Sequence, residues 1–195
     1  DSWTATSTVN APAPRAVHAA VWSGDRMLVW GGLNGSTNLN TGAQYNPLGD
    51  IWTAISTVNA PAPRAGYTAV FAGDSMVIWG GQNGVTYLGS GGRYDPGADT
   101  WKPTSTGNAP APRIGHSAVA AGRFMIVWGG GNDFEIFGSG AMYDTLTDAW
   151  FDLPNAGSPA PRAFHTAVWT GYEMLIWGGT EFFSEPTTGF RLQPF

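Results

Sequence analysis

The chain contains no cysteine, one lysine and few charged residues of any kind. Charged side chains make up 12% of its 195 residues, and the formal net charge is −5. Without cysteine, stability owes nothing to disulfides, and cysteine usage says nothing about the redox compartment. The scarcity of cations argues against a phosphate-backbone partner, so we expect no nucleic acid. No apolar run approaches the roughly 20 residues that a bilayer-spanning helix needs, and we expect no membrane insertion.

The chain is instead rich in glycine, proline and aromatic residues, arranged in a repeat. It has 28 Gly, 14 Pro, 10 Trp and 10 Phe. Four landmarks recur every 49 residues: a Trp, a Pro-x-Pro-Arg cluster, a Met on an apolar run and a Trp-Gly-Gly triplet. The first landmark is Trp3, Trp52, Trp101 and Trp150. A period of about 50 residues is typical of repeat architectures. We therefore predict one domain, residues 1–195, with repeats at about 3–51, 52–100, 101–149 and 150–195.

Each copy predicts four antiparallel strands. In the second copy, residues 65–72 alternate small and large side chains, and Gly73-Asp74 has the composition of a tight hairpin turn. The apolar run 75–79 has strand length, and a third strand is expected around residues 92–94. Asp95-Pro96-Gly97 is a turn signal, after which a fourth strand begins at Thr100-Trp101. Four such strands form the blade of a β-propeller, so the fold class is all-β.

The spacing of the residues that recur in each copy resembles that of the kelch repeat. A Gly-Gly doublet after an apolar strand is followed by a spaced Tyr and Trp. The sets are Gly80-Gly81, Tyr94 and Trp101; Gly31-Gly32, Tyr45 and Trp52; and Gly129-Gly130, Tyr143 and Trp150. The resemblance covers essentially the whole chain and implies a β-propeller of kelch-like blades. Kelch-like propellers include peptide-binding adaptors, sugar-binding modules and enzymes, so the fold alone does not choose a function.

The copies begin and end out of phase with the blade. Asp1 aligns with Asp50 at the start of a fourth strand, and Phe195 ends a third strand. Residues 1–7 are therefore predicted to supply the outer strand of the last blade, which would remove an open edge. Three arrangements stay open: a four-bladed ring, two chains in an eight-bladed ring, or part of a larger ring. A homodimer or assembly into a larger ring is therefore one of the expected partnerships. The third strand of copy four carries Leu192 where the others carry Tyr, so this copy is atypical.

Four periodic arginines precede the innermost strands and form a first set of candidate binding residues. They are Arg15, Arg64, Arg113 and Arg162. A ring of guanidinium groups at one mouth of the channel would suit carboxylate or sulfate ligands or an acidic peptide. In the structural alternative, each arginine joins adjacent blades by binding backbone carbonyls of the neighbouring link.

His18, His116 and His165 occupy one repeated position, with Tyr67 in copy two. Three imidazoles near one axis are a metal-site pattern. A hydrogen bond between blades is the alternative that also accommodates Tyr67, and we expect no metal. A galactose-oxidase type of copper site is excluded because the family's site uses a cysteine-crosslinked tyrosine. We expect no cofactor and assign no catalytic residue.

The sequence varies most between the Gly-Gly doublet and the next glycine. Copies three and four place aromatic rings beside carboxylates in this stretch, a combination that suits stacking on sugars or anchoring a protein. In the alternative, individual Phe residues pack down on the blade. The candidate binding residues here are Tyr87, Phe134, Glu135, Phe137, Glu181, Phe182, Phe183 and Glu185. In kelch-like blades, this stretch lies on the same face as the arginines.

The function expected from these residues is non-catalytic binding of a protein or glycan partner through the variable loops and arginines. One alternative is an enzyme acting on a sugar or small anion at the channel mouth. Another is a structural assembly subunit. The sequence begins at Asp1 without an initiator Met, which fits a processed secreted protein or an excised fragment. The first of these favours an extracellular or periplasmic location.

Overall fold

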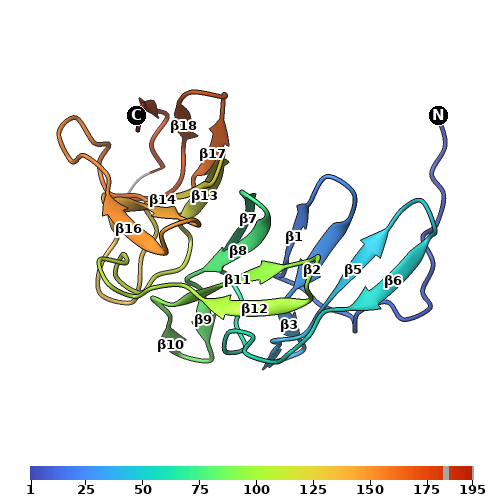
Figure 1. The fold of residues 1–195 in the computed structure, drawn as a ribbon. Coiled ribbons are helices and arrows are strands. Elements are labelled where there is room, and N and C mark those ends of the chain that lie inside the picture. Colours follow the sequence, from blue (N-terminus) through green and yellow to red (C-terminus); the bar gives the residue numbers. More distant parts are fainter. Residues whose placement is uncertain (182–184, 195) are drawn as a thin grey trace.

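The structure is a computed structural model that describes residues 1–181 and 185–194. Four antiparallel sheets follow one another along the chain and stand side by side in an open arc (Figure 1). Strands make up all the regular secondary structure of the described residues. No helix in this part of the chain is long and apolar enough to cross a membrane.

Three of the sheets are complete four-stranded blades, as predicted. The first contains β1 (Ala19–Trp22), β2 (Met27–Trp30), β5 (Gly42–Asn46) and β6 (Ile51–Ala54). The second contains β7 (Thr68–Ala72), β8 (Ser75–Trp79), β11 (Gly91–Asp95) and β12 (Thr100–Pro103). The third contains β13 (Ser117–Ala121), β14 (Phe124–Trp128), β15 (Gly140–Asp144) and β16 (Ala149–Asp152). The fourth sheet has three described strands: β17 (Thr166–Trp169), β18 (Met174–Trp177) and β19 (Gly189–Leu192).

Two further hairpins lie in the stretches that the sequence marked as variable. They pair β3 (Leu33–Asn34) with β4 (Thr37–Asn38), and β9 (Gln82–Asn83) with β10 (Thr86–Tyr87). The Gly-Gly doublet allows the chain to turn into them. Gly81 has φ of +88°, and a Cβ there would lie 2.7 Å from the carbonyl oxygen of Ala65. Only glycine combines a positive φ with so close an approach.

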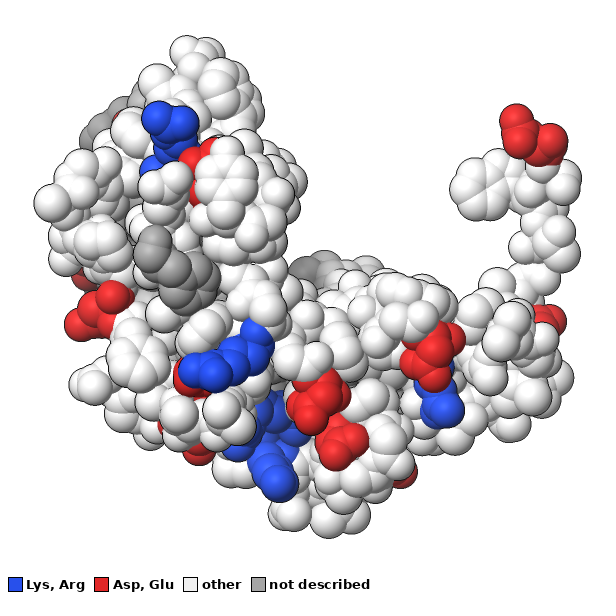
Figure 2. Space-filling view, turned by 45° about the horizontal axis from the view of Figure 1, so that its top comes forward, with Lys and Arg blue, Asp and Glu red and all other residues white. Residues whose placement is uncertain are grey.

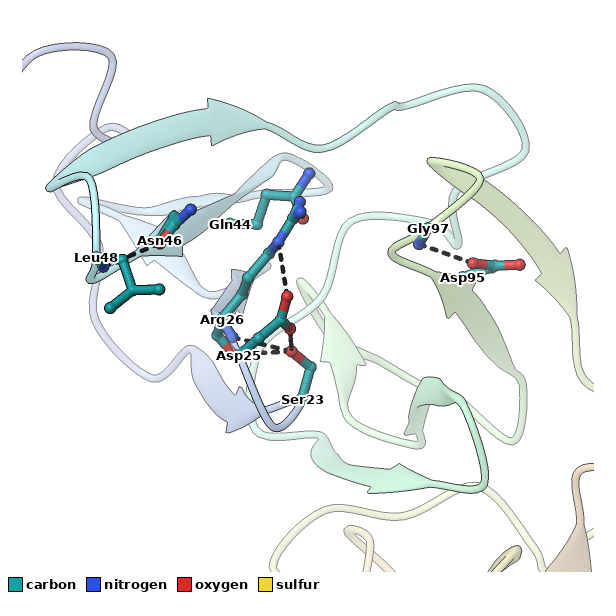
Figure 3. Close-up of polar contacts among 8 residues, drawn as sticks. All are labelled: Ser23, Asp25, Arg26, Gln44, Asn46, Leu48, Asp95 and Gly97. Carbon is teal, nitrogen blue, oxygen red and sulfur yellow. Dashed lines mark hydrogen bonds and ion pairs between the residues drawn. The ribbon is translucent and has the colours of Figure 1, made fainter.

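Short polar side chains close the turns at the opposite end of the blades (Figure 3). Ser23 donates a hydrogen bond from its hydroxyl to Asp25 at 2.7 Å, and Arg26 pairs with the same carboxylate at 3.3 Å. The side chain of Asp95 accepts a bond from the amide of Gly97 at 2.8 Å. Such local bonds are the reason that Asp, Asn and Ser are frequent in turns.

The core lies between adjacent blades. The ring centroids of Trp30 in the first blade and Trp101 in the second are 5.3 Å apart, and those of Trp79 and Trp150 are 5.5 Å apart. Each outer-strand Trp also donates its indole N–H to the preceding link, as Trp101 does to the carbonyl of Ser56 at 2.9 Å. The periodic Trp residues therefore join each blade to the previous one.

The arc does not close within one chain. The N-terminal segment projects from the first blade, far from the C-terminal end of the arc (Figure 1). Residues 1–8 form no strand, and Trp3 is fully exposed. The predicted pairing of residues 1–7 with the last blade is therefore not formed in the single chain, because the arc holds the two ends apart.

Candidate functional site

The variable stretches of the first three blades, residues 33–41, 82–90 and 131–139, lie side by side. Together with the described part of 180–188 we call them the loop face. Hydrogen bonds join the stretches of neighbouring blades. Asn38 donates its side-chain amide to Asn83 at 3.0 Å, and the Tyr87 hydroxyl donates to Asp133 at 2.6 Å. The β9–β10 hairpin and the neighbouring β3 lie at the same edge of the arc (Figure 1). The loops are thus held in a fixed relation to one another.

The four arginines lie beneath this surface rather than on it. Arg64, Arg113 and Arg162 are each 1% exposed, and Arg15 is half-buried. Arg113 donates from Nε to the carbonyl of Ala111 at 2.9 Å, and from Nη1 to the carbonyls of Gly129 at 2.9 Å and Ser139 at 3.0 Å. The other three arginines bind the equivalent carbonyls. These carbonyls belong to the same blade as the arginine, at the two ends of its loop.

This burial corrects the expectation that the arginines present open forks to a ligand. The structural alternative is right that each arginine binds backbone carbonyls, but it is wrong about their place, because they lie in the arginine's own blade and not in a neighbouring link. Burial lowers the pKa of Arg64 and of Arg113 to about 10, so both remain charged at neutral pH. Several carbonyl oxygens around each guanidinium compensate part of the cost of burying its charge. The arginines therefore shape the loop face from below.

Phe137 belongs to this support as well. Its ring lies under the guanidinium of Arg113, 4.0 Å from centroid to Cζ, and its side chain is 7% exposed. The prediction that Phe137 is a binding residue of the surface is therefore wrong, because its side chain is buried. The alternative, in which a loop phenylalanine packs down on the blade, holds at this position.

The loop face nevertheless presents hydrophobic tips. Val85 is 93% exposed and Phe134 is 90% exposed, and the two occupy equivalent positions in neighbouring blades. Both backbone amides at the third tip, those of Phe134 and Glu135, donate to the side chain of Asn132. Asp133 and Glu135 are exposed on either side of Phe134. An apolar tip between two carboxylates is the most accessible feature of this stretch.

The fourth copy contributes less to the described surface. The Arg162 guanidinium lies 3.4 Å from a carboxylate oxygen of Glu181, which is partly buried, and Glu185 is exposed. Phe182 and Phe183 lie outside the described residues.

The sequence did not point to two residues near the loop face, Val17 and Phe164. Val17 and Phe164 have φ of +53° and +57°, in the left-handed region that β-branched and aromatic residues rarely adopt. The repeat places Gly66 and Gly115 at the same position in the second and third copies. Both non-glycine side chains are exposed. The signal available in the sequence was the replacement of a repeated glycine by a large apolar residue, and strain of this kind is typical of functional surfaces.

The repeated histidines connect blades instead of gathering around an axis. Nε2 of His116 lies 2.8 Å from the hydroxyl of Thr68, and Nε2 of His165 lies 2.7 Å from that of Ser117, each on the preceding blade. Tyr67 donates to the carbonyl of Trp30 and accepts from the amide of Ala19. Burial lowers the pKa of His116 to about 3 and that of His165 to about 4, so both rings are neutral at pH 7. Within the described residues, no cluster of three or more His, Asp or Glu could hold a metal ion.

Two arginines at the opposite end of the blades are paired with carboxylates. A groove at the turn end of the second and third blades is lined by Arg93, Lys102, Arg123, Asp74 and Asp95, among others. Arg123 pairs with Asp144 at 3.0 Å, and Arg93 lies 3.9 Å from Asp148. The face shown in Figure 2 is largely uncharged, and its cations lie close to carboxylates. Because two of the three cations that line this groove are paired with carboxylates, the groove offers no cluster of free charges of one sign.

Comparison with known proteins agrees with the repeat and the blades. The family model of the KLHDC2/KLHL20/DRC7 kelch-repeats domain matches residues 1–181. The chain belongs to the kelch-repeat family. No curated protein matches the chain. Kelch-repeat domains generally mediate protein binding, and they form β-propellers.

Proposed function

We propose that this kelch-repeat chain is a non-catalytic module that binds a protein partner through the loop face. The observation that carries the proposal is the pair of exposed apolar tips, Val85 and Phe134, at equivalent positions of adjacent blades. Exposed aromatic side chains held by a rigid surround are typical anchors of protein interfaces. The Tyr87–Asp133 bond between the two loops supplies that rigidity.

The charges beside the tips favour a partner with basic residues. Asp133, Glu135 and Glu185 are exposed, whereas three of the four periodic arginines are 1% exposed and Arg15 is half-buried. A ligand approaching the loop face therefore meets carboxylates and not arginines. Complementary charge accelerates encounter and excludes acidic competitors. We infer that the recognised segment combines arginine or lysine with an apolar side chain that contacts Phe134.

The exposed Phe164 extends this proposed surface toward the inner edge of the arc. The amide of Arg162, two residues earlier, donates to the carbonyl of Phe137, so this segment adjoins the third loop. A large apolar side chain kept at a strained backbone position is consistent with a role in binding.

Selection from a random peptide library displayed on phage tests the proposal. We expect enrichment of peptides with a basic residue near an aromatic or aliphatic one. Phe134→Ala should weaken the binding of selected peptides by about 2 kcal/mol or more, the usual loss at an anchor residue. Leu146→Ala is the matched control, because Leu146 is 72% exposed in the same blade but lies in a turn remote from the loop.

Three results would contradict the proposal: no selected peptide, selected peptides that bind Phe134→Ala unchanged, or equal losses for the control. A glycan array run in parallel tests sugars as the alternative partner. Glycan binding that depends on Phe134, without any peptide binding, would replace the protein partner with a sugar.

A further inference from the structure

The last blade lacks an outer strand among the described residues. In the three complete blades the outer-strand Trp stands opposite a residue of the third strand, in the pairs Tyr45–Trp52, Tyr94–Trp101 and Tyr143–Trp150. In the last blade Leu192 occupies the Tyr position. Its strand β19 pairs with β18 on one side and has no described strand on the other.

A pocket marks the place where the missing Trp belongs. In the third blade, Trp150 packs with Trp79 of the previous blade and with Met125 and Tyr143 of its own. One repeat later, the equivalents of these three residues are Trp128, Met174 and Leu192, and all three line a pocket. Pro154 also lines it and is equivalent to Ser105, whose carbonyl accepts the indole N–H of Trp150 at 2.9 Å. The pocket thus offers both the apolar walls and the acceptor that bind a Trp elsewhere in the molecule.

The chain carries an unused Trp in the matching sequence. Residues 1–7 read DSWTATS, and residues 50–56 around Trp52 read DIWTAIS. Trp3 is fully exposed, which is unfavourable for the largest apolar side chain. The segment therefore has the sequence of an outer strand without a sheet to join.

Apolar residues of the last blade are exposed on the face that a following blade covers elsewhere in the arc. Trp30 and Trp79 are 0% exposed because the next blade covers them, whereas the equivalent Trp177 is 59% exposed. Val168 is exposed, while its equivalents Val70 and Val119 are buried. Both residues line an open hollow on this side of the last sheet.

The hydrogen bonds between adjacent blades indicate which blade fits the exposed face of the last blade. Where the following blade carries a histidine, the preceding blade supplies a hydroxyl: Thr68 for His116 and Ser117 for His165. Where it carries Tyr67, the preceding blade has Ala19, whose amide binds the tyrosine hydroxyl. His18 at the open start of the arc is exposed, and Thr166 at the open end holds the matching hydroxyl. The first blade of this sequence is therefore complementary to its last blade.

We propose that two copies of the chain close into an eight-bladed ring through two identical junctions. At each junction, Trp3 of one copy enters the Trp128–Met174–Leu192 pocket of the other, and its strand pairs with β19. His18 then binds the Thr166 hydroxyl, and Trp177 is covered by the first blade of the other copy. The occupant is a second copy because one chain holds its own two ends at opposite sides of the arc (Figure 1). Two equal contacts related by a two-fold axis close the ring and give the last blade of each copy its outer strand.

One contact of the internal blades is not reproduced at the junction. Asp99 accepts hydrogen bonds from the amide of Ser56 and the hydroxyl of Tyr94. The corresponding residues of the last blade, Pro154 and Leu192, have neither donor. Because this Asp position lies at the surface, Asp1 of the other copy stays hydrated, and Trp3 carries the contact. The proposal is independent of what the loop face binds.

The absence of cysteine makes a disulfide test direct. By the register of Arg93 opposite Lys102, Arg191 stands opposite Thr4 of the second copy. The double variant Thr4→Cys/Arg191→Cys should form a covalent dimer under mild oxidation. Its control is Thr4→Cys/Arg93→Cys, in which the β11 position equivalent to Arg191 is already paired with β12. A disulfide within one chain would indicate a four-bladed ring, and equal crosslinking of the control would indicate random collision. Either result overturns the proposal.

Sedimentation equilibrium of the unmodified chain completes the test. We expect twice the chain mass, and at least a tenfold weaker association for Trp3→Ala and for His18→Ala. Both side chains are exposed in the single chain, so neither variant should prevent folding. Leu146→Ala is the control and should associate normally. A monomer at micromolar concentration, or dimers unaffected by Trp3→Ala, would refute the proposal.

Discussion

Each periodic arginine binds carbonyls 16 and 26 residues further along the chain, in all four copies. These carbonyls stand at the start and the end of the loop that belongs to the same blade. One planar side chain with several donors can reach both ends at once, which a lysine ammonium cannot do with the same geometry. The arginines thus connect the constant part of each copy to its variable loop.

Arg113→Ala should lower the free energy of unfolding by about 3 kcal/mol, because it leaves buried carbonyl oxygens without a donor. Arg113→Lys should recover only part of the loss. Urea denaturation measures both. The control is Lys102→Ala, which removes an exposed cation from β12 and should cost less than about 1 kcal/mol. Equal losses for Arg113→Ala and Lys102→Ala would contradict the structural role.

The buried histidines make stability depend on pH. The pKa of His116 is lowered to about 3 and that of His165 to about 4, mainly by burial, while both regain ordinary values on unfolding. Between these values and about pH 6.5, the unfolded chain binds more protons than the folded one, so stability is lost as the pH falls. From pH 7 to pH 4.5 we expect a loss of about 2 kcal/mol or more, measured by urea denaturation at each pH.

The chain itself suggests the control for this acid sensitivity. His116→Tyr with Thr68→Ala reproduces the Tyr67–Ala19 pair of the preceding blade and removes one titrating group. The double variant should fold and lose less stability at pH 4.5 than the parent. If its acid sensitivity equals that of the parent, groups other than His116 are responsible.

At the scale of the element, the Gly-Gly doublet allows the chain to turn from the second strand of each blade into its loop. Gly81 approaches the carbonyl of Ala65 too closely for any side chain, whereas Gly84 in the β9–β10 hairpin has open space around it. Both glycines have positive φ, so an alanine would strain the backbone at either position. Only at Gly81 would its methyl group also clash with a neighbouring atom. Comparing the two positions therefore separates glycine's tolerance of positive φ from its lack of a side chain.

Gly81→Ala should destabilise the chain by about 3 kcal/mol or more, because the new methyl group forces the strands apart. Gly84→Ala should cost about 1 kcal/mol, the usual cost of an alanine at positive φ. Thermal and urea denaturation of the two variants give the comparison. Similar losses at both positions would show that the close approach at Gly81 is relieved by a small backbone shift.

At the scale of the whole molecule, the last sheet has no outer strand among the described residues, and Trp3 and Trp177 are exposed at the two ends of the arc. If two copies close the ring, folding and association are coupled by mass action. The melting temperature should then rise with protein concentration, and Trp3→Ala should abolish that dependence. Calorimetry over a hundredfold range of concentration measures it. A constant melting temperature for the parent chain would contradict ring closure by association.

The sequence alone was sufficient for the blade. Hydrophobic runs, turn residues and the 49-residue period predicted the strands, because strand pairing in a blade is local and each turn has its own signal. The sequence also predicted that the repeated histidines form hydrogen bonds between blades, a role that Tyr67 can fill in the second copy. The bonds of His116 to Thr68 and of His165 to Ser117 confirm this prediction for those two histidines. The two small loop hairpins were missed because stretches of two paired residues leave no hydrophobic periodicity.

Only the tertiary structure decided which of the candidate residues are accessible. Composition does not distinguish Phe134 at a loop tip from Phe137 beneath Arg113, because both are phenylalanines in one variable stretch. Burial depends on the packing of the loop against the guanidinium, and that contact brings together residues 24 positions apart. The same holds for closure: the repeat determined how one blade follows another, whereas the geometry of the blades placed the two ends of the chain apart.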